Sequence, residues 1–366
     1  MGFCIIFSSY AAVKPAGEAG TVQKSVVKLS PEKAILIDGK TFFPISVWQQ
    51  PKYLFDYHKS LGINSILCPP KGENKKWFMD AAWEKGLYVF ASYSEVFKDH
   101  PSILGWITVI DEGDIENTVA GLERVKRNDP DRLSYIHIGW DNVLDFNAGR
   151  ASDYEKVFGK ADTTCCHVFP MGRNNPDGLH MVGDVVDFMN KYSKNKIAPM
   201  IDIECAKLEK GERKGSAPSR DQVRCEIWEA IVHGAKGLCY FTISFEPFVW
   251  SQIPAQNEGV LKYNNNLIRD LKDVILLGKE DVILEKSADE GVELNVMAKR
   301  VEKDLYLFAV NTANKAGKIK LKLNEQYKIK EILNYERREE KLEFKNNLLE
   351  EEYSKYQVKI YKLTIE

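Results

Sequence analysis

The stretch HPSILGWITVIDEGD, from His100 to Asp114, is an apolar segment that ends in acidic residues. Its run of Ile, Leu, Trp and Val is continuous, which is typical of a strand covered on both faces. Asp111 and Glu112 follow this run directly. Two interpretations stay open from the stretch alone: the strand holds Glu112 rigidly as a functional group, or solvated acids end the strand.

Seven further strand candidates alternate along the chain with segments of helical spacing. Their ranges are Phe43–Trp48, Asn64–Cys68, Leu87–Ala91, Leu133–Ile138, Asp162–Phe169, Pro199–Glu204 and Leu238–Ser244. Ser219 and Gln222 form a capping-box pattern before one of the helical segments. With Ile103–Ile110, the pattern predicts an α/β fold of the (β/α)8 TIM-barrel class. A doubly wound open sheet is the alternative, but the first strand–helix turn, VWQQPKY, contains no glycine for a phosphate-binding turn.

The two ends of the chain differ in pattern from the middle. From about Val282, apolar and polar residues alternate between short polar turns, which predicts a small C-terminal antiparallel β-sandwich. SVVKLSPEKAILIDG, over residues 25–39, is typical of a hairpin that closes the lower mouth of a barrel. We therefore expect a leader over residues 1–24, the barrel with its hairpin over 25–280, and the β-sandwich over 281–366.

The composition excludes several classes of protein. Lys and Arg number 51 against 53 Asp and Glu, so the formal net charge of −2 gives no basic field for nucleic acid. No apolar run has the length of a membrane-spanning helix. The seven cysteines contain no C-x-x-C pair, which argues against a zinc ribbon. The N-terminal MGFCIIFSSYAAVKPAGEAG is similar to a signal peptide that lacks its basic region, so a secreted or periplasmic protein and a cytoplasmic protein with a leader both stay open.

Side chains that can take part in catalysis or binding lie at the predicted C-terminal ends of the strands. Barrels of this class have their functional sites at these ends. Glu112 ends the fourth strand and Glu204 the seventh, so two carboxyl groups are expected across one mouth. Glycoside hydrolysis needs such a pair, with one group protonated and the other ionised. The aromatic and polar residues expected to bind a sugar around them are Trp48, Gln49, Tyr93, Asp111, His137, Trp140, His167, Phe169, Glu246 and Trp250.

Several of these segments resemble the clan A glycoside hydrolases, TIM barrels with an acid/base on strand four and a nucleophile on strand seven. HPSILGWITVIDEGD resembles their fourth strand, DGKTFFPISVWQQP the first and HGAKGLCYFTIS the eighth, while YSKYQVKIYKL is similar to the closing strand of their accessory β-sandwich. The resemblance implies that Glu112 is the acid/base and, by strand position, that Glu204 is the nucleophile. It implies a retaining glycoside hydrolase that acts on a β-linked, mostly neutral oligo- or polysaccharide and needs no cofactor.

The chain departs from the pattern of that clan at three positions. Gly113 replaces the usual proline after the acid/base, and His167 and Phe169 stand where Asp and Tyr are common. Glu246 is an alternative second acid. Asp202 lies two residues before Glu204 on the same strand face and could substitute for it.

Two other classes of function stay open. The first is a non-catalytic carbohydrate-binding barrel, which would keep the aromatic residues and lose the geometry of the acid pair. The second is a metal-dependent amidohydrolase, because His137 and His167 lie on adjacent predicted strands. The first strand has no His-x-His pair and no third ligand stands out, so we expect no metal.

Overall fold

The computed structural model describes residues 23–108, 114–139, 151–210, 213–278, 283–337, 341–344 and 346–365. Parallel strands form a closed barrel, as the sequence predicts. Around the barrel these strands are β4 (Ile45–Trp48), β5 (Ser65–Leu67), β6 (Tyr88–Ser92), β7 (Ile103–Thr108), β8 (Leu133–Gly139), β9 (Thr163–His167), β10 (Ala198–Glu204) and β13 (Gly237–Phe241). The predicted (β/α)8 class is therefore confirmed.

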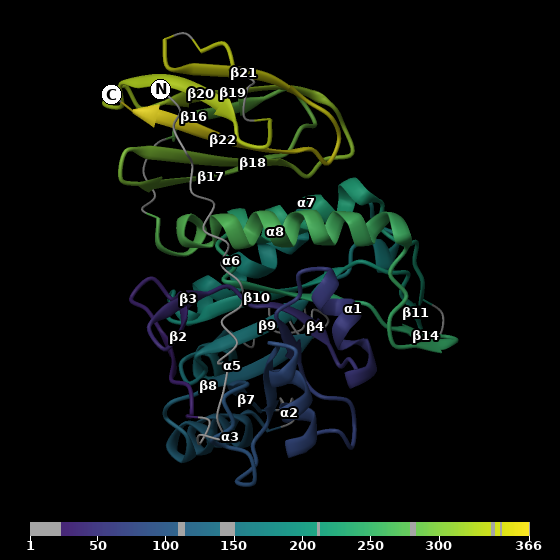
Figure 1. Cartoon of the computed structure of the whole chain (residues 1–366). Helices are drawn as coiled ribbons and strands as arrows, with labels where there is room; N and C mark the ends of the chain where they lie inside the picture. Colours follow the sequence, from purple (N-terminus) through teal and green to yellow (C-terminus); the bar gives the residue numbers. More distant parts are fainter. Residues whose placement is uncertain are drawn as a thin grey trace, which may run out of the picture.

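The barrel strands are covered by helices on their outer side (Figure 1). The helices are α1 (Phe55–Ser60), α2 (Lys76–Glu84), α3 (Ile115–Asn128), α5 (Ala151–Phe158), α6 (Met181–Ser193), α7 (Arg220–Val232) and α8 (Ala255–Leu277), with 3-10 turns η1 (Lys52–Leu54) and η2 (Met171–Arg173). The predicted capping box begins α7: Ser219 Oγ accepts from Gln222 N, and Gln222 Oε1 accepts from Ser219 N. Among the described residues, no helix is long and apolar enough to span a membrane.

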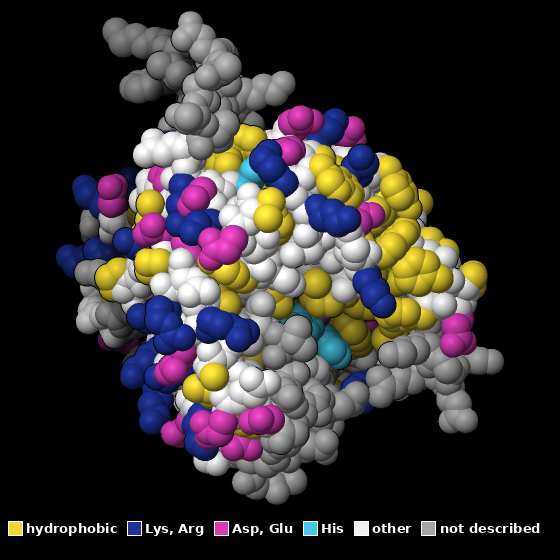
Figure 2. Space-filling view, turned by 90° about the horizontal axis from the view of Figure 1, so that it is seen from below, with side chains coloured by type: hydrophobic (Ala, Val, Ile, Leu, Met, Phe, Trp, Pro, Cys, Tyr) yellow, Lys and Arg dark blue, Asp and Glu magenta, His cyan; other side chains and the backbone are white. Residues whose placement is uncertain are grey.

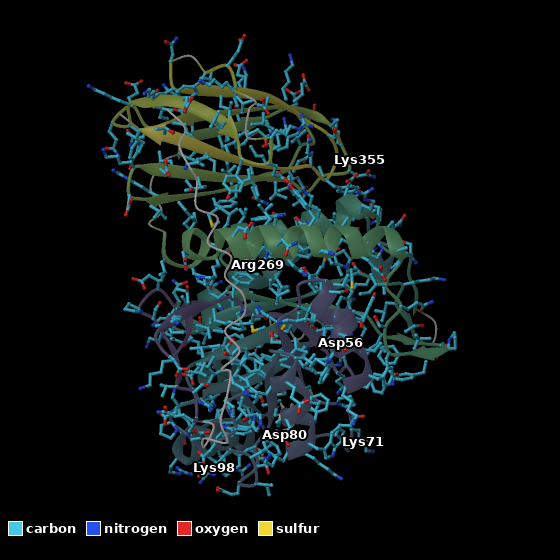
Figure 3. The ribbon with its side chains drawn as sticks, in the orientation of Figure 1. Asp56, Lys71, Asp80, Lys98, Arg269 and Lys355 are labelled. Carbon is cyan, nitrogen blue, oxygen red and sulfur yellow. The ribbon has the colours of Figure 1, made fainter. Side chains whose placement is uncertain are left out.

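The lower end of the barrel is closed by an antiparallel sheet of β1 (Val27–Leu29), β2 (Ile35–Ile37) and β3 (Lys40–Phe42). Val27 and Ile35 are buried in one cluster with barrel-interior residues such as Leu104 and Tyr135. The predicted hairpin thus has a third strand, because Lys40–Phe42 pairs with β2 before the first barrel strand begins. Charged side chains such as Asp56 and Lys71 lie on the outside of the barrel (Figure 3).

Two antiparallel sheets form the C-terminal part. One contains β16 (Ile283–Ala288), β19 (Gly317–Leu323) and β21 (Leu348–Tyr353); the other contains β17 (Leu294–Val301), β18 (Asp304–Asn311), β22 (Val358–Ile365) and β20 (Ile329–Asn334). Residues of both sheets, among them Leu307, Leu321 and Leu349, share one buried core, as expected for a sandwich. The expected boundary at 280/281 falls between the described residues 278 and 283.

The second of these sheets packs against α7 and α8, which lie between it and the barrel (Figure 1). The Phe308 ring stacks on Trp228 of α7, with ring centroids 5.6 Å apart. One guanidinium nitrogen of Arg224 in α7 donates to both oxygens of Glu336, at 2.9 and 2.8 Å, and Tyr263 of α8 donates to the same carboxylate. Stacked rings and a hydrogen-bonded ion pair therefore connect the sheets to the outer helices.

Trp106 holds β7 to the helical layer outside it. Its side chain is fully buried, and Nε1 donates to Asp129 Oδ2 at 2.9 Å. Asp129 follows the last residue of α3, and its other oxygen accepts from Lys24 at 2.6 Å. The tryptophan of the HPSILGW stretch thus has a structural role on the outer face of the strand.

Gly105 of β7 pairs with Leu133 of β8 and leaves no room for a side chain. A Cβ atom at this position would lie 2.6 Å from the backbone oxygen of Leu133 and 3.0 Å from the Phe90 ring. A backbone atom in a barrel cannot move independently of its strand. The glycine of the ILGW motif is therefore required by packing inside the barrel wall.

Gly105→Ala is expected to lower the free energy of unfolding by about 2 kcal/mol, within the usual cost of overpacking a core. Urea denaturation would measure the loss. Gly259→Ala is the matched control, since Gly259 is exposed in α8 and a Cβ there meets nothing within 4 Å. That control is expected to stabilise the chain by up to about 1 kcal/mol, because alanine is the better helix former. Equal stability of the Gly105→Ala and wild-type proteins would contradict the packing argument.

Candidate active site

The C-terminal ends of β4, β8 and β9 bring together four of the residues predicted to bind a substrate. The Trp48 ring lies 4.6 Å from the His137 ring, and the His137 ring lies 5.6 Å from that of His167. His167 stacks on Phe169 at 5.0 Å, with an interplanar angle of 12°. Phe169 in turn contacts Phe241 at the end of β13. Because β4 and β8 lie on opposite sides of the barrel, these rings form a continuous chain across the barrel mouth, where the sequence predicts the site.

Asp202 joins the two histidines from the next strand of the barrel. His137 Nε2 lies 3.3 Å from His167 Nδ1 and 3.3 Å from Asp202 Oδ2, and His167 Nδ1 lies 3.9 Å from the same carboxylate oxygen. The register explains this meeting, because His167 is the cross-strand partner of Asp202. Asp202 is therefore a third potential ligand beside the two histidines, which the sequence did not indicate.

The charge of Asp202 is balanced within this cluster. Its side chain is 1% exposed. Burial alone would raise the pKa of this carboxyl, but the facing His137 and His167 lower it below its usual value. Cys165 Sγ donates to the other carboxylate oxygen at 3.3 Å. Asp202 is thus an ionised group held on the barrel interior.

Glu204, the predicted nucleophile, ends β10 as expected, but its carboxylate is held by the neighbouring turn. The residue is 2% exposed. Oε1 accepts from the backbone N–H of Met171 at 2.5 Å, and Oε2 accepts from that of Gly172 at 2.8 Å. Both donors belong to η2, which follows β9. In this conformation the carboxylate is orientated by backbone donors and largely shielded from solvent.

Glu226 of α7 lies against the carboxyl group of Glu204. Burial raises the pKa of Glu204 to about 7, and two backbone donors and a hydrogen bond with Glu226 oppose that rise. Burial and the neighbouring Glu204 raise the pKa of the fully buried Glu226. One proton shared between the two carboxyl groups accounts for this arrangement.

Other predicted binding residues make contacts away from the histidine cluster. Tyr93 packs edge-on against Trp106 and donates to Glu95, which places it beside the helix-facing core. Trp250 packs on Phe248, and its backbone oxygen accepts from Gln50 at 2.8 Å.

Gln49 and Glu246 lie in turns near the strand ends. Gln49 follows β4 with a positive φ of 47°, and its Nε2 donates to Cys68 Sγ at 3.7 Å. Glu246 is exposed between the short strands β14 (Ser244–Phe245) and β15 (Phe248–Val249). Substrate binding by these residues stays a prediction.

Three predicted site residues lie outside the described residues: Asp111, Glu112 and Trp140. The described part of β7 ends at Thr108, which pairs with Ile136 of β8, and β8 ends at Gly139, which pairs with His167. The roles of Glu112 as acid/base and of the other two in binding stay predictions.

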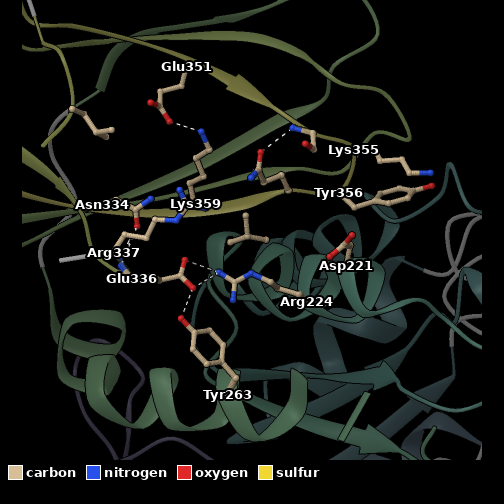
Figure 4. Close-up of a pocket in the computed structure, with 14 residues that line it drawn as sticks. Asp221, Arg224, Tyr263, Asn334, Glu336, Arg337, Glu351, Lys355, Tyr356 and Lys359 are labelled. Atoms are coloured by element: carbon tan, nitrogen blue, oxygen red, sulfur yellow. Dashed lines mark hydrogen bonds and ion pairs between the residues drawn. The ribbon is translucent and has the colours of Figure 1, made fainter. Parts of the chain in front are cut away.

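A cavity of about 580 Å³ lies between α7, α8 and the C-terminal sheets (Figure 4). None of its lining residues belongs to a barrel strand. Two ion pairs lie in its lining, Arg224 with Glu336 and Lys359 with Glu351. The barrel mouth, with its histidines and carboxyl groups, is the better candidate for an active site than this cavity. Figure 2 shows histidine side chains within a hollow bordered by hydrophobic side chains.

Comparison with known proteins gives structural neighbours only. No family model matches the chain, and no curated protein sequence matches it. A glycoside hydrolase family 5 structure from Bacteroides vulgatus aligns with a TM-score of 0.58 and 12% identity over 93% of each chain. A structure described as a glycoside hydrolase has a TM-score of 0.58 and 13% identity over 93% of this chain and 97% of its own. A maltogenic alpha-amylase from Thermotoga neapolitana has a TM-score of 0.58 and 10% identity over 89% of this chain and 99% of its own.

These likenesses establish the fold that the chain shares with barrel glycoside hydrolases. At 10–13% identity they assign no residue a role. The chemistry must therefore be argued from the strand ends themselves.

Proposed function

We propose that the chain is a retaining glycoside hydrolase that acts on a β-linked, mostly neutral oligo- or polysaccharide. The observation that carries the proposal is the carboxyl group of Glu204 at the C-terminal end of β10, on the wall of a closed barrel beside the aromatic mouth. Glu204 is the proposed nucleophile, and Glu112, after the fourth barrel strand, is the proposed acid/base. Retention requires two carboxyl groups about 5–5.5 Å apart.

The contacts of Glu204 orientate its carboxyl group, whose pKa is raised by burial to about 7. Two backbone N–H groups orientate both oxygens, and such bonds favour the carboxylate against the effect of burial. The rings of Phe169 and Phe241 are neighbours at this level of the barrel, 5.0 Å apart. Aromatic faces of this kind suit the C–H surface of a sugar ring.

A second candidate is a barrel that binds saccharides without cleaving them. The observation in its favour is the low exposure of Glu204, whose oxygens are both engaged by η2. A nucleophile must reach the anomeric carbon, so hydrolysis requires η2 or the Glu204 side chain to move.

Aryl α- and β-glycosides, assayed in matched pairs with the purified chain, test the two candidates. We expect cleavage of β-glycosides, with the β-anomer released first when the reaction is followed by NMR. A 2-deoxy-2-fluoro-β-glycoside of the cleaved sugar is expected to label Glu204, as identified by peptide mass. Cleavage of α-glycosides alone, or release of the α-anomer, would contradict the proposal. Oligosaccharide binding without cleavage of any substrate would favour the second candidate.

A further inference from the structure

The meeting of His137, His167 and Asp202 has a geometry that sugar binding does not require. Three potential ligand atoms from three adjacent strands face one common point: His137 Nε2, His167 Nδ1 and Asp202 Oδ2. We propose that these atoms bind a divalent transition-metal ion at the mouth of the barrel, with an open coordination position toward solvent. The proposal is independent of the proposed hydrolysis.

The distances between the three atoms match those between ligands of one small cation. They are 3.3, 3.3 and 3.9 Å. Zinc with nitrogen and oxygen ligands at about 2.0–2.1 Å has its tetrahedral ligands about 3.3–3.4 Å apart. Two of the three distances agree directly, whereas the third, between His167 Nδ1 and Asp202 Oδ2, is longer at 3.9 Å.

Neighbouring groups orientate the ligand atoms toward that point. Tyr135 Oη lies 2.9 Å from His137 Nδ1, which leaves Nε2 as the nitrogen that faces the cluster. Cys165 Sγ bonds to Asp202 Oδ1 and leaves Oδ2 for the common point. Trp48 and Phe169 pack against the two imidazole rings and restrict their rotation. Metal-binding histidines and carboxylates are usually held by partners of this kind.

The charge of the cluster also favours a cation. The Asp202 carboxylate is 1% exposed, and its ion pairs within the described residues involve His137 and His167 alone. A carboxylate buried to this degree is costly in free energy unless cationic or hydrogen-bonding groups compensate its charge. A divalent ion bound by neutral imidazoles would compensate this charge.

The exposed fractions of the ligand side chains indicate where the open coordination position lies. The side chains of His137 and His167 are 18% and 33% exposed, whereas that of Asp202 is 1% exposed. Solvent thus reaches the cluster from the mouth. Two imidazoles, one carboxylate and an open position are typical of catalytic Zn²⁺ sites and of non-haem Fe²⁺ sites.

Titration of the chelator-treated chain with Zn²⁺ in a calorimeter tests the proposal directly. We expect one ion per folded chain and a rise in melting temperature, because the ion binds the native state. Co²⁺ in place of Zn²⁺ is expected to give visible absorption bands of a four-coordinate N/O site. An anaerobic titration with Fe²⁺ compares the two site types, and tight binding of either ion supports the proposal.

Variants identify the ligands. His167→Ala and Asp202→Asn are each expected to weaken Zn²⁺ binding more than about 100-fold, because changing a mere orientating partner already costs about 10–100-fold. Tyr135→Phe is expected to weaken it about 10-fold, an effect that a purely packing role of the tyrosine would not produce. His180→Ala is the matched control, because His180 also lies near two carboxylates, Asp184 and Glu293, but outside the barrel mouth.

Two results would overturn the proposal. One is the absence of binding at millimolar Zn²⁺, and the other is an unchanged affinity for Zn²⁺ in His167→Ala. If Asp202→Asn does not fold, the partly exposed His167 still decides the outcome, since its truncation leaves the barrel interior intact. A loss of affinity in His180→Ala as large as that in His167→Ala would place the ion elsewhere.

Discussion

Glu204→Gln is expected to abolish hydrolysis of every glycoside that the wild-type chain cleaves. An amide cannot attack the anomeric carbon, so the glycosyl-enzyme intermediate does not form. The glutamine oxygen can still accept from one backbone N–H of η2, whereas its NH2 group cannot accept from the other. We expect kcat/KM to fall by more than about 10⁴-fold, beyond the range that general acid–base catalysis contributes. Initial rates on aryl glycosides measure this loss.

Glu112→Gln is expected to act selectively in the same assay. Loss of the proton donor should lower the rate by about 10²–10⁴-fold when the leaving group is a poor one. Aryl leaving groups of low pKa need no protonation, so their first bond cleavage is expected to be much less affected. The ratio of rates on activated and natural substrates therefore separates the acid/base from the nucleophile. Full activity of Glu112→Gln on a natural glycoside would show that Glu112 only ends its strand.

Two further substitutions complete this experiment. Glu352→Gln on β21 is the matched control, since Glu352 is exposed on the C-terminal sheet, where its side chain lies 3.7 Å from Lys318. It is expected to keep wild-type activity. Glu246→Gln decides between the two candidate second acids: if it abolishes turnover while Glu204→Gln does not, Glu246 is the nucleophile and Glu204 is structural.

Much of the fold could be predicted because the barrel strands carry their own signal. The run ILGWITVI has no charged residue on either face, and APMI begins in the same way before Asp202 and Glu204. Continuous apolar runs of this kind are typical of parallel strands that are covered on both faces. The strand ends then indicate which residues face the mouth. The meeting of Trp48 with His137 and of His167 with Phe169 follows from that rule alone.

The rest of the site depends on tertiary relations that no local pattern expresses. The approach of Asp202 to His167 depends on the register of two parallel strands, which is determined by loops and packing. The shielding of Glu204 depends on a single turn, η2, whose backbone N–H groups carry no sequence signature. The sequence gives a weak indication that Glu226 is buried, because its neighbours Cys225, Ile227 and Trp228 are apolar. The helix on which it lies is buried on almost every side.

Glu226→Gln is expected to stabilise the chain at alkaline pH. The folded-state pKa of Glu204 is raised to about 7, above its usual value of 4.5. The stability from this group is therefore fully present below about pH 4.5 and is lost as the pH rises through about 7. A glutamine at 226 can donate an N–H to the Glu204 carboxylate in place of the shared proton. We expect a gain of about 1–3 kcal/mol at pH 8, comparable to the cost of an unsatisfied buried group, and a smaller difference at pH 5. Urea denaturation at the two pH values measures both.

Glu229→Gln, one turn further along α7, is expected to have the opposite effect. Glu229 is buried, but Asn295 donates to its carboxylate at 2.8 Å and His233 Nε2 lies 3.1 Å from it. Burial alone would lower the pKa of His233, yet its bonds to Asp187 and Glu229 raise that pKa to about 10, so the imidazolium needs its partners. Removing the charge of Glu229 is expected to cost about 3 kcal/mol, the lower end of the cost of breaking a buried pair. If both substitutions destabilise the chain equally at pH 8, Glu204 and Glu226 share no proton, and Glu226 stabilises the fold as an ordinary polar residue.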